Sequence, residues 1–226
     1  MQIKEYLSTK KGRIETLVLP LLAFIFNMIA YSGARLIAGG RYHHDITSSV
    51  DTLIPLVPWT ITVYFGCYIF WVLSWFIAAM QNENRRYRFF AADTFAKAIS
   101  MAVFIAYPTT NIRPEIVGDG IWSELMRFLY SVDSADNLLP SLHCMTSWLC
   151  FIGVRRRKDI SLTFKCFACV LAFAVFISTL TTKQHVIVDV FAGALLAELC
   201  YLTAGLKPIR ETYGKFISCI VRLFAK

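Results

Sequence analysis

Blocks of apolar residues dominate the chain and indicate its architecture. A helix needs about 20 such residues to cross a bilayer. Six runs reach or approach that length, at roughly Leu17–Ile37, Leu53–Met80, Phe90–Tyr107, Leu138–Val154, Leu162–Leu180 and His185–Leu206. The pattern predicts an all-α polytopic membrane protein. We expect a six-transmembrane-helix bundle that forms a single membrane-embedded domain over residues 1–226.

Some runs carry further information. The third is the least apolar, because it contains Asp93 and Lys97, which are spaced to pair across one helical turn. The first run follows several basic residues, as a signal peptide does, but it is long for that role and we expect a retained span. The segments Ile121–Tyr130 and Phe216–Phe224 each place their large apolar residues on one helical face. They are candidates for short interfacial helices or for packed connecting helices.

Basic residues alternate between linkers and predict an orientation. With six spans, the basic N-terminal segment, the NENRRYR and RRRK linkers and the C-terminal tail share one side, while the opposite linkers are rich in Asp and Glu. Basic loops stay in the cytoplasm, so we expect both termini there and an integral protein of a plasma or inner membrane. Anionic lipids at the cytoplasmic face are then expected partners.

Composition supports a membrane protein and excludes other classes. Of the 226 residues 57% are hydrophobic and 17% are charged, against about 25% charged residues in soluble domains. The formal charge of +8 forms no single patch, so nucleic acid is not an expected partner. The seven cysteines lie mostly in apolar runs and show neither a disulfide framework nor a zinc spacing.

Three motifs carry candidate chemistry. His185 and Asp189 share one helical face, so the carboxylate can orient the imidazole and leave its other nitrogen free as a nucleophile or base. In LPSLHC, Ser141 suits a helix start whose first N–H groups attract phosphate, and His143 sits in that first turn. In NIRP, Arg113 offers a guanidinium suited to phosphate.

The predicted topology places these motifs at the outer ends of the third, fourth and sixth spans. Two histidines, one carboxylate and several phosphate-binding groups together describe a phosphoryl-transfer site on the extracytoplasmic side. No carboxylate cluster is present to hold magnesium, so we expect no metal and no cofactor. The candidate catalytic residues are His143, His185 and Asp189, and the candidate phosphate-binding residues are Arg113, Ser141, Leu142 and Lys183.

The ordered set RP, PSLH and S-x6-H-x3-D (Ser178, His185, Asp189) resembles the type-2 phosphatidic acid phosphatase superfamily. That superfamily includes lipid phosphatases, undecaprenyl pyrophosphate phosphatases, vanadium haloperoxidases and inositol phosphorylceramide synthases. The resemblance implies a six-helix core with its site at the outer membrane face. It also implies that His185 attacks phosphorus, that Asp189 orients its ring, and that His143 protonates the leaving oxygen.

The chain departs from the family pattern at three places. Ala106 stands where a lysine is usual, Thr179 stands where an arginine is usual, and PSLH replaces the commoner PSGH. PSLH is similar to the form in fungal inositol phosphorylceramide synthases. Lys183 is the obvious replacement for one missing cation, while Lys97 lies too far along its helix to be one.

These observations leave several functions open. We expect a lipid phosphatase acting on a membrane lipid phosphate. A lipid phosphotransferase of the inositol phosphorylceramide synthase type uses the same site, and a protein that binds or transports lipid would keep the fold without catalysis. A metal hydrolase is a further alternative, since RYHHD places His43 and His44 on the outer side. Adjacent residues rarely converge on one ion, which favours loop roles for these two histidines.

Overall fold

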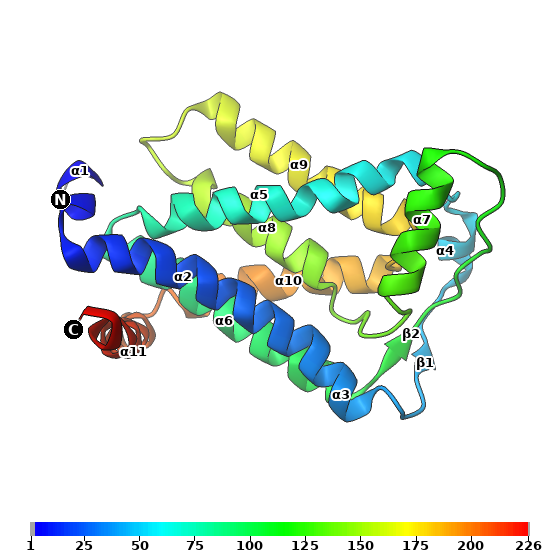
Figure 1. Cartoon of the computed structure of the whole chain (residues 1–226), viewed down its shortest axis with the longest axis horizontal. Helices are drawn as coiled ribbons and strands as arrows, with labels where there is room; N and C mark the ends of the chain where they lie inside the picture. Colours follow the sequence, from blue (N-terminus) through cyan, green and yellow to red (C-terminus); the bar gives the residue numbers. More distant parts are fainter. Residues whose placement is uncertain (1–2, 226) are drawn as a thin grey trace.

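A bundle of long helices makes up most of the computed structural model, which describes residues 3–225 (Figure 1). The long helices run along a common axis and are α2 (Lys10–Met28), α5 (Ile61–Ala79), α6 (Glu83–Ala106), α8 (Leu142–Arg155), α9 (Leu162–Thr181) and α10 (Ile187–Thr203). Through a π-helical turn at Ile29–Gly33, α2 continues into α3 (Ala34–Ala38). Each predicted apolar run overlaps one long helix, so the helical fold class is confirmed.

The remaining helical elements lie at the two ends of the bundle. They are α1 (Ile3–Ser8), α4 (Ser49–Leu53), a 3-10 turn (Pro58–Thr60), α7 (Ile121–Val132) and α11 (Lys207–Ala225). The all-α expectation missed one small feature, a parallel pair of two-residue strands, β1 (His44–Asp45) and β2 (Thr109–Thr110). This pair ties the segment after α3 to the segment after α6.

Length and composition identify an integral membrane protein, but they do not confirm six spans. Among the described residues, the helices long and apolar enough to cross a membrane are Lys10–Ala38, Pro58–Ala79, Glu83–Ala106 and Leu162–Thr181. A fifth arises only if α10 and α11, bent by 91°, form one broken span. With 14 residues, α8 is only about 21 Å long, whereas the hydrocarbon core measures about 30 Å.

Local sequence signals explain where the helices differ from the predicted runs. The second run was placed too early, because Pro55 and Pro58 interrupt it and α5 begins only at Ile61. The third run was placed too late, because Asn82 caps α6 by accepting the Arg85 N–H at 3.1 Å.

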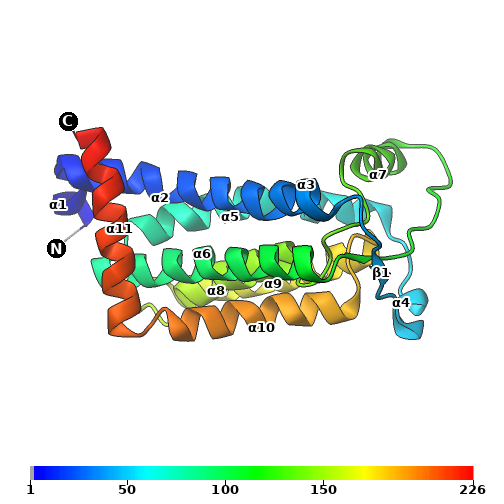
Figure 2. The same cartoon turned by 90° about the horizontal axis from the view of Figure 1, so that it is seen from below.

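The bundle has two distinct ends (Figure 2). At one end lie α1 and α11, and α11 crosses the long helices with Tyr213, Ile217 and Val221 buried. At the other end lie α4, α7 and the strand pair, and α7 buries Met126 and Leu129 in a cluster with residues of α5. Both segments predicted to be amphipathic are therefore helices that pack against the bundle.

A buried ion pair lies inside the bundle. Lys97 Nζ is 2.6 Å from Asp93 Oδ2, and both side chains are fully buried, which confirms the pairing predicted from their spacing. The ammonium also donates to the Ala23 carbonyl at 2.8 Å and lies over the Trp75 ring. Because its donors face α2, Lys97 joins α6 to α2.

The first turn of α8 lies directly against α10. The Ser141 N–H donates to the Asp189 carbonyl at 3.0 Å. A Cβ on Gly193 would lie 2.5 Å from the Ser141 carbonyl oxygen, which is closer than real contacts allow. Only glycine permits this approach, so Gly193 sets the spacing between the two helices.

We predict that Gly193→Ala destabilises the protein by about 1–3 kcal/mol, because the added methyl group forces α8 and α10 apart. Thermal unfolding in detergent measures the change. Gly66→Ala in α5 is the matched control, since a Cβ there meets nothing within 4 Å, and the better helix former should leave stability equal or higher. Equal melting temperatures for the two variants would contradict the prediction.

Candidate active site

His143 lies in the first turn of α8, at the end of the bundle that carries α7. The Ser141 side chain caps the helix and accepts the Cys144 N–H at 3.2 Å. The first N–H groups of a helix have no acceptor within it, so those of Leu142 and His143 are available to an anion. The sequence prediction of a helix start at Ser141 is confirmed.

His185 lies two residues before the start of α10 and is oriented by Asp189. Its Nδ1 lies 3.0 Å from Asp189 Oδ2, and the other carboxylate oxygen accepts the Val186 N–H at 3.1 Å. This geometry suits the tautomer with the proton on Nδ1, in which the carboxylate accepts that proton and Nε2 keeps its lone pair. Asp189 is fully buried, and the Thr179 carbonyl accepts the His185 backbone N–H at 3.1 Å.

The two imidazoles face the same space. Their ring centroids are 5.6 Å apart, although the residues are 42 positions apart in the chain. Tyr64 of α5 lies against His143 with a centroid distance of 4.5 Å. The Tyr68 hydroxyl lies 3.2 Å from His143 Nε2. Aromatic side chains of α5 therefore fix the orientation of His143.

Arg113 reaches the same space from the segment after β2. Its guanidinium donates to the Asp133 carbonyl at 2.5 Å, to the Ser134 carbonyl at 3.2 Å and to Gln184 Oε1 at 2.7 Å. The buried Nε has no hydrogen-bond partner among the described residues. Arg113 thus joins the loop before α8 to the loop before α10 and retains donor capacity.

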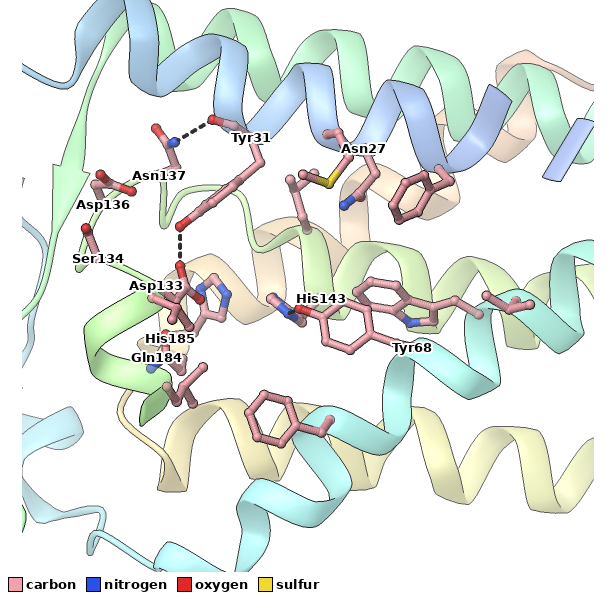
Figure 3. Close-up of a pocket in the computed structure, with 18 of the residues that line it drawn as sticks. Asn27, Tyr31, Tyr68, Asp133, Ser134, Asp136, Asn137, His143, Gln184 and His185 are labelled. Atoms are coloured by element: carbon pink, nitrogen blue, oxygen red, sulfur yellow. Dashed lines mark hydrogen bonds between the residues drawn. The ribbon is translucent and has the colours of Figure 1, made fainter. Parts of the chain in front are cut away.

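These residues line one cavity of about 310 Å³ (Figure 3). The polar side chains gather at one end, where Figure 3 shows Asp133, His185 and Gln184 close together, with His143 facing them beside Tyr68. The remaining wall is mostly apolar and includes Phe24, Met28, Phe65, Val72, Trp75 and Val132. The cavity therefore offers a polar pocket continuous with an apolar slot.

Lys183 is placed apart from that polar pocket. Its backbone adopts a left-handed conformation with φ of 56°, and its Nζ donates to the carbonyls of Asp51 and Ile54 at 2.9 and 2.5 Å. It lines a second cavity, to whose wall His185 also contributes. Its assignment to phosphate binding stays a prediction, and the amine of Lys183 does not line the cavity that contains His143.

Two of the three departures from the family pattern fall where a cation is usual, and neither carries a charge into the cavity. Thr179 is fully buried and donates to the Phe176 carbonyl at 2.8 Å. Ala106 is the last residue of α6. Neither lines the cavity, so Arg113 is the cationic side chain found there among the described residues.

Sequence reasoning missed several residues of this site. Asp133 accepts hydrogen bonds from the hydroxyls of Tyr31 and Tyr64, and it lines the cavity with Tyr68. Tyrosines within apolar runs give no signal of their own, because they also occur in ordinary cores. Gln184 was detectable in principle, since it stands directly beside Lys183 and His185.

The adjacent histidines lie elsewhere. The His44 ring stacks on Tyr107 with a centroid distance of 4.4 Å, and His43 Nδ1 lies 2.8 Å from the Arg41 carbonyl. Across residues 3–225, no three His, Cys, Asp or Glu side chains are grouped as potential metal ligands. The local contacts of these two histidines are those of loop residues.

Comparison with known families gives the identity of this arrangement. The model described as the PAP2 superfamily matches residues 94–205, about half of the chain and the part that contains Arg113, both histidines and Asp189. The chain belongs to this superfamily, the type-2 phosphatidic acid phosphatases. Its members include phosphatases and phosphotransferases that act on phosphate esters. No curated protein and no solved structure gives a significant match to the chain.

Asp51 links α4 to the start of α10 beside the site. One carboxylate oxygen accepts the Ile187 N–H at 2.7 Å, and the other accepts the N–H and hydroxyl of Ser48. Burial by itself raises the pKa of Asp51, but the Ser48 and Ile187 hydrogen bonds and nearby Lys183 outweigh it and hold that pKa below its usual value. Burial in turn lowers the pKa of Lys183.

A depressed carboxyl pKa makes stability depend on pH. The ionised Asp51 carboxylate adds to the free energy of unfolding, and this contribution is fully present above the pKa of about 3.9 that an aspartate has in the unfolded chain. It is lost as the pH falls through the lower pKa of Asp51 in the folded protein. We predict that Asp51→Asn lowers the melting temperature by about 2–4 °C at pH 7, and that the gap from wild type closes toward pH 3.

Melting curves in detergent from pH 7 to pH 3 test this dependence. Asp119→Asn is the control, because Asp119 is fully exposed and its nearest cation lies at 4.0 Å. Its melting temperature should follow that of wild type at every pH. A constant gap for Asp51→Asn across the range would contradict the assignment.

Proposed function

We propose that the protein is an integral membrane phosphatase that removes phosphate from a lipid phosphate through a phosphohistidine intermediate, without a metal ion. The main support is the pair of imidazoles with centroids 5.6 Å apart in a cavity that is polar at one end and apolar beyond. A lipid phosphate, such as phosphatidic acid or an isoprenyl phosphate, has this same division between head and tail.

The first chemical step forms a bond between nitrogen and phosphorus. The lone pair on His185 Nε2 attacks phosphorus, and the P–O bond to the lipid alcohol breaks. Asp189 stabilises the positive charge that develops on the ring, since it accepts the Nδ1 proton at 3.0 Å. His143 donates a proton to the departing alkoxide.

The second step regenerates the enzyme. A water molecule gives a proton to His143 and attacks phosphorus, and the N–P bond breaks to release inorganic phosphate. In both steps charge builds on the equatorial phosphate oxygens. Arg113 and the first N–H groups of α8 are the donors that stabilise this charge, and the loss of one such donor typically costs about 10²–10³ in rate.

The topology that fits this function has six spans, with both termini in the cytoplasm and the site on the extracytoplasmic side. The first and last described helices, α1 and α11, lie at one end of the bundle and the histidines lie at the other (Figures 1 and 2). The basic linkers after α5 and after α8 share the end with α1 and α11, as the charge pattern requires. In this arrangement α8 and α10 are the two further spans that bring the number to six. Anionic lipids then contact the cytoplasmic end of the bundle.

A lipid phosphotransferase is the second candidate, because an alcohol can replace water in the second step. The PSLH form of the second motif favours it. Incubation with a lipid phosphate, with and without an alcohol acceptor, separates the two functions: hydrolysis yields free phosphate and transfer yields the phosphate monoester of the acceptor alcohol. A protein that binds or transports lipid without catalysis would yield neither product.

We predict that His185→Ala lowers phosphate release from lipid phosphates at least about 10³-fold, because the nucleophile is lost. Wild-type activity should survive excess chelator. His44→Ala is the matched control, since its ring stacks on Tyr107 outside the cavity, and it should retain wild-type turnover. Release at the wild-type rate by His185→Ala would exclude the phosphohistidine mechanism.

A further inference from the structure

An arginine cluster lies at the end of the bundle opposite the histidines. The start of α6 and the end of α8 both lie at that end, with α1 and α11 (Figures 1 and 2). They place four side chains around one cavity of about 180 Å³, namely Arg85, Arg88, Arg156 and Arg157, and the other residues that line it are uncharged. Arg156 follows His143 by 13 positions, so it lies about 20 Å away along α8. The cavity is therefore separate from the candidate active site.

The arginine cluster holds more positive charge than its carboxylate neighbour balances. Within residues 3–225 the carboxylate that pairs with these guanidinium groups is that of Asp159, which lies outside the cavity lining. Arg157 donates to it through Nε at 3.1 Å and through Nη2, and Arg85 Nη1 lies 3.8 Å away. Nearby Glu198 is already bound through both oxygens by Arg155. Like charges repel, so the cluster lacks negative charge.

Two members of the cluster retain unused donors. The Arg156 side chain is exposed and makes no hydrogen bond to the described part of the chain. Arg157 is only 7% exposed, and its Nη1 is buried without a partner among residues 3–225. A buried donor without an acceptor is costly, and such groups are normally paired. The unpaired nitrogen therefore indicates that an acceptor is missing beside the cavity.

The Arg88 guanidinium is held in one orientation. Its Nε donates to the Tyr201 carbonyl at 2.9 Å, and its Cζ lies 4.0 Å from the centroid of the Tyr201 ring. A Cβ on Gly205 would lie 2.9 Å from Arg88 Nη2, so the turn after α10 packs against the same group. A guanidinium fixed in this way loses little freedom when its terminal nitrogens bind an acceptor.

We propose that the arginine cluster binds a phosphate group. Guanidinium groups suit phosphate because two parallel N–H donors match two of its oxygens. Pockets for drug-sized ligands measure about 300–1,000 Å³, so a cavity of about 180 Å³ suits a single phosphate group. Bound phosphate supplies both the missing negative charge and the missing acceptor. The site shares no residue with the catalytic cavity, and it stands independently of the proposed catalytic function.

Two sources carry this chemistry. One is the headgroup of an anionic phospholipid such as phosphatidylglycerol, and the other is free inorganic phosphate. In either case binding depends on particular side chains, whereas a general attraction between basic linkers and an anionic membrane depends only on the total charge. Variants that lose the same charge at different positions therefore separate a defined site from that general attraction.

Arg156→Gln is the test variant and Lys158→Gln is its matched control. The Arg156 side chain makes no hydrogen bond within residues 3–225, so its loss should leave the fold intact. Lys158 is exposed in the same linker and does not line the cavity. Wild type and both variants are titrated with phosphatidylglycerol in detergent, and bound lipid is counted by native mass spectrometry. We expect binding to weaken about tenfold in Arg156→Gln and less than about twofold in Lys158→Gln, since one hydrogen bond to a charged group is lost only in the first.

A second titration identifies the source of the phosphate. Equilibrium dialysis with radiolabelled inorganic phosphate measures binding to the same three proteins. A tenfold loss in Arg156→Gln in this assay identifies free phosphate as a ligand, and a loss confined to phosphatidylglycerol identifies the lipid headgroup. Phosphate bound in the catalytic cavity cancels from the comparison, because Arg156 lies about 20 Å from His143.

Arg88→Gln, which removes a guanidinium of α6, should reproduce the loss. Melting temperatures in detergent establish that each variant is folded. Equal weakening by Arg156→Gln and Lys158→Gln would reveal only a general attraction to the basic linker and would overturn the inference. Binding of both ligands that is unchanged in Arg156→Gln would overturn it as well.

Discussion

The contact between the first turn of α8 and α10 determines where both histidines lie. The Ser141 N–H donates to the Asp189 carbonyl, and the absence of a side chain at Gly193 lets the two backbones approach. His143 and His185 each stand at the start of one of these helices. A helix is stiff, so fixing the two starts fixes the 5.6 Å between the rings.

The charges around the cavity are arranged so that an anion can enter. Asp133 and Asp136 lie at its polar end, but each is engaged: Asp133 accepts two tyrosine hydroxyls, and Arg35 binds Asp136 through two nitrogens at 2.8 Å. Arg35 therefore neutralises Asp136, whereas the Asp133 carboxylate is held by two neutral hydroxyls. The positive groups at this end are the guanidinium of Arg113 and the free N–H groups at the start of α8.

The membrane restricts how these polar groups are held. In hydrocarbon an unpaired polar group is expensive, and the bundle pairs Asp93 with Lys97 and satisfies Arg155 through Glu198. Against this background Asn27 is conspicuous, because its side chain faces the cavity without a partner within residues 3–225.

The sequence by itself determined the helices, the capped start at Ser141 and the pairing of His185 with Asp189, because each depends on residues within a few positions of one another. It also grouped His143, His185 and Arg113 at one end, since hydrophobic runs fix which loops share a side. Only the tertiary structure decided that Lys183 turns toward Asp51 and Ile54, and that Tyr68, Asp133 and Asn27 line the cavity. Those placements follow from side-chain directions set by packing between distant helices, which no local pattern encodes.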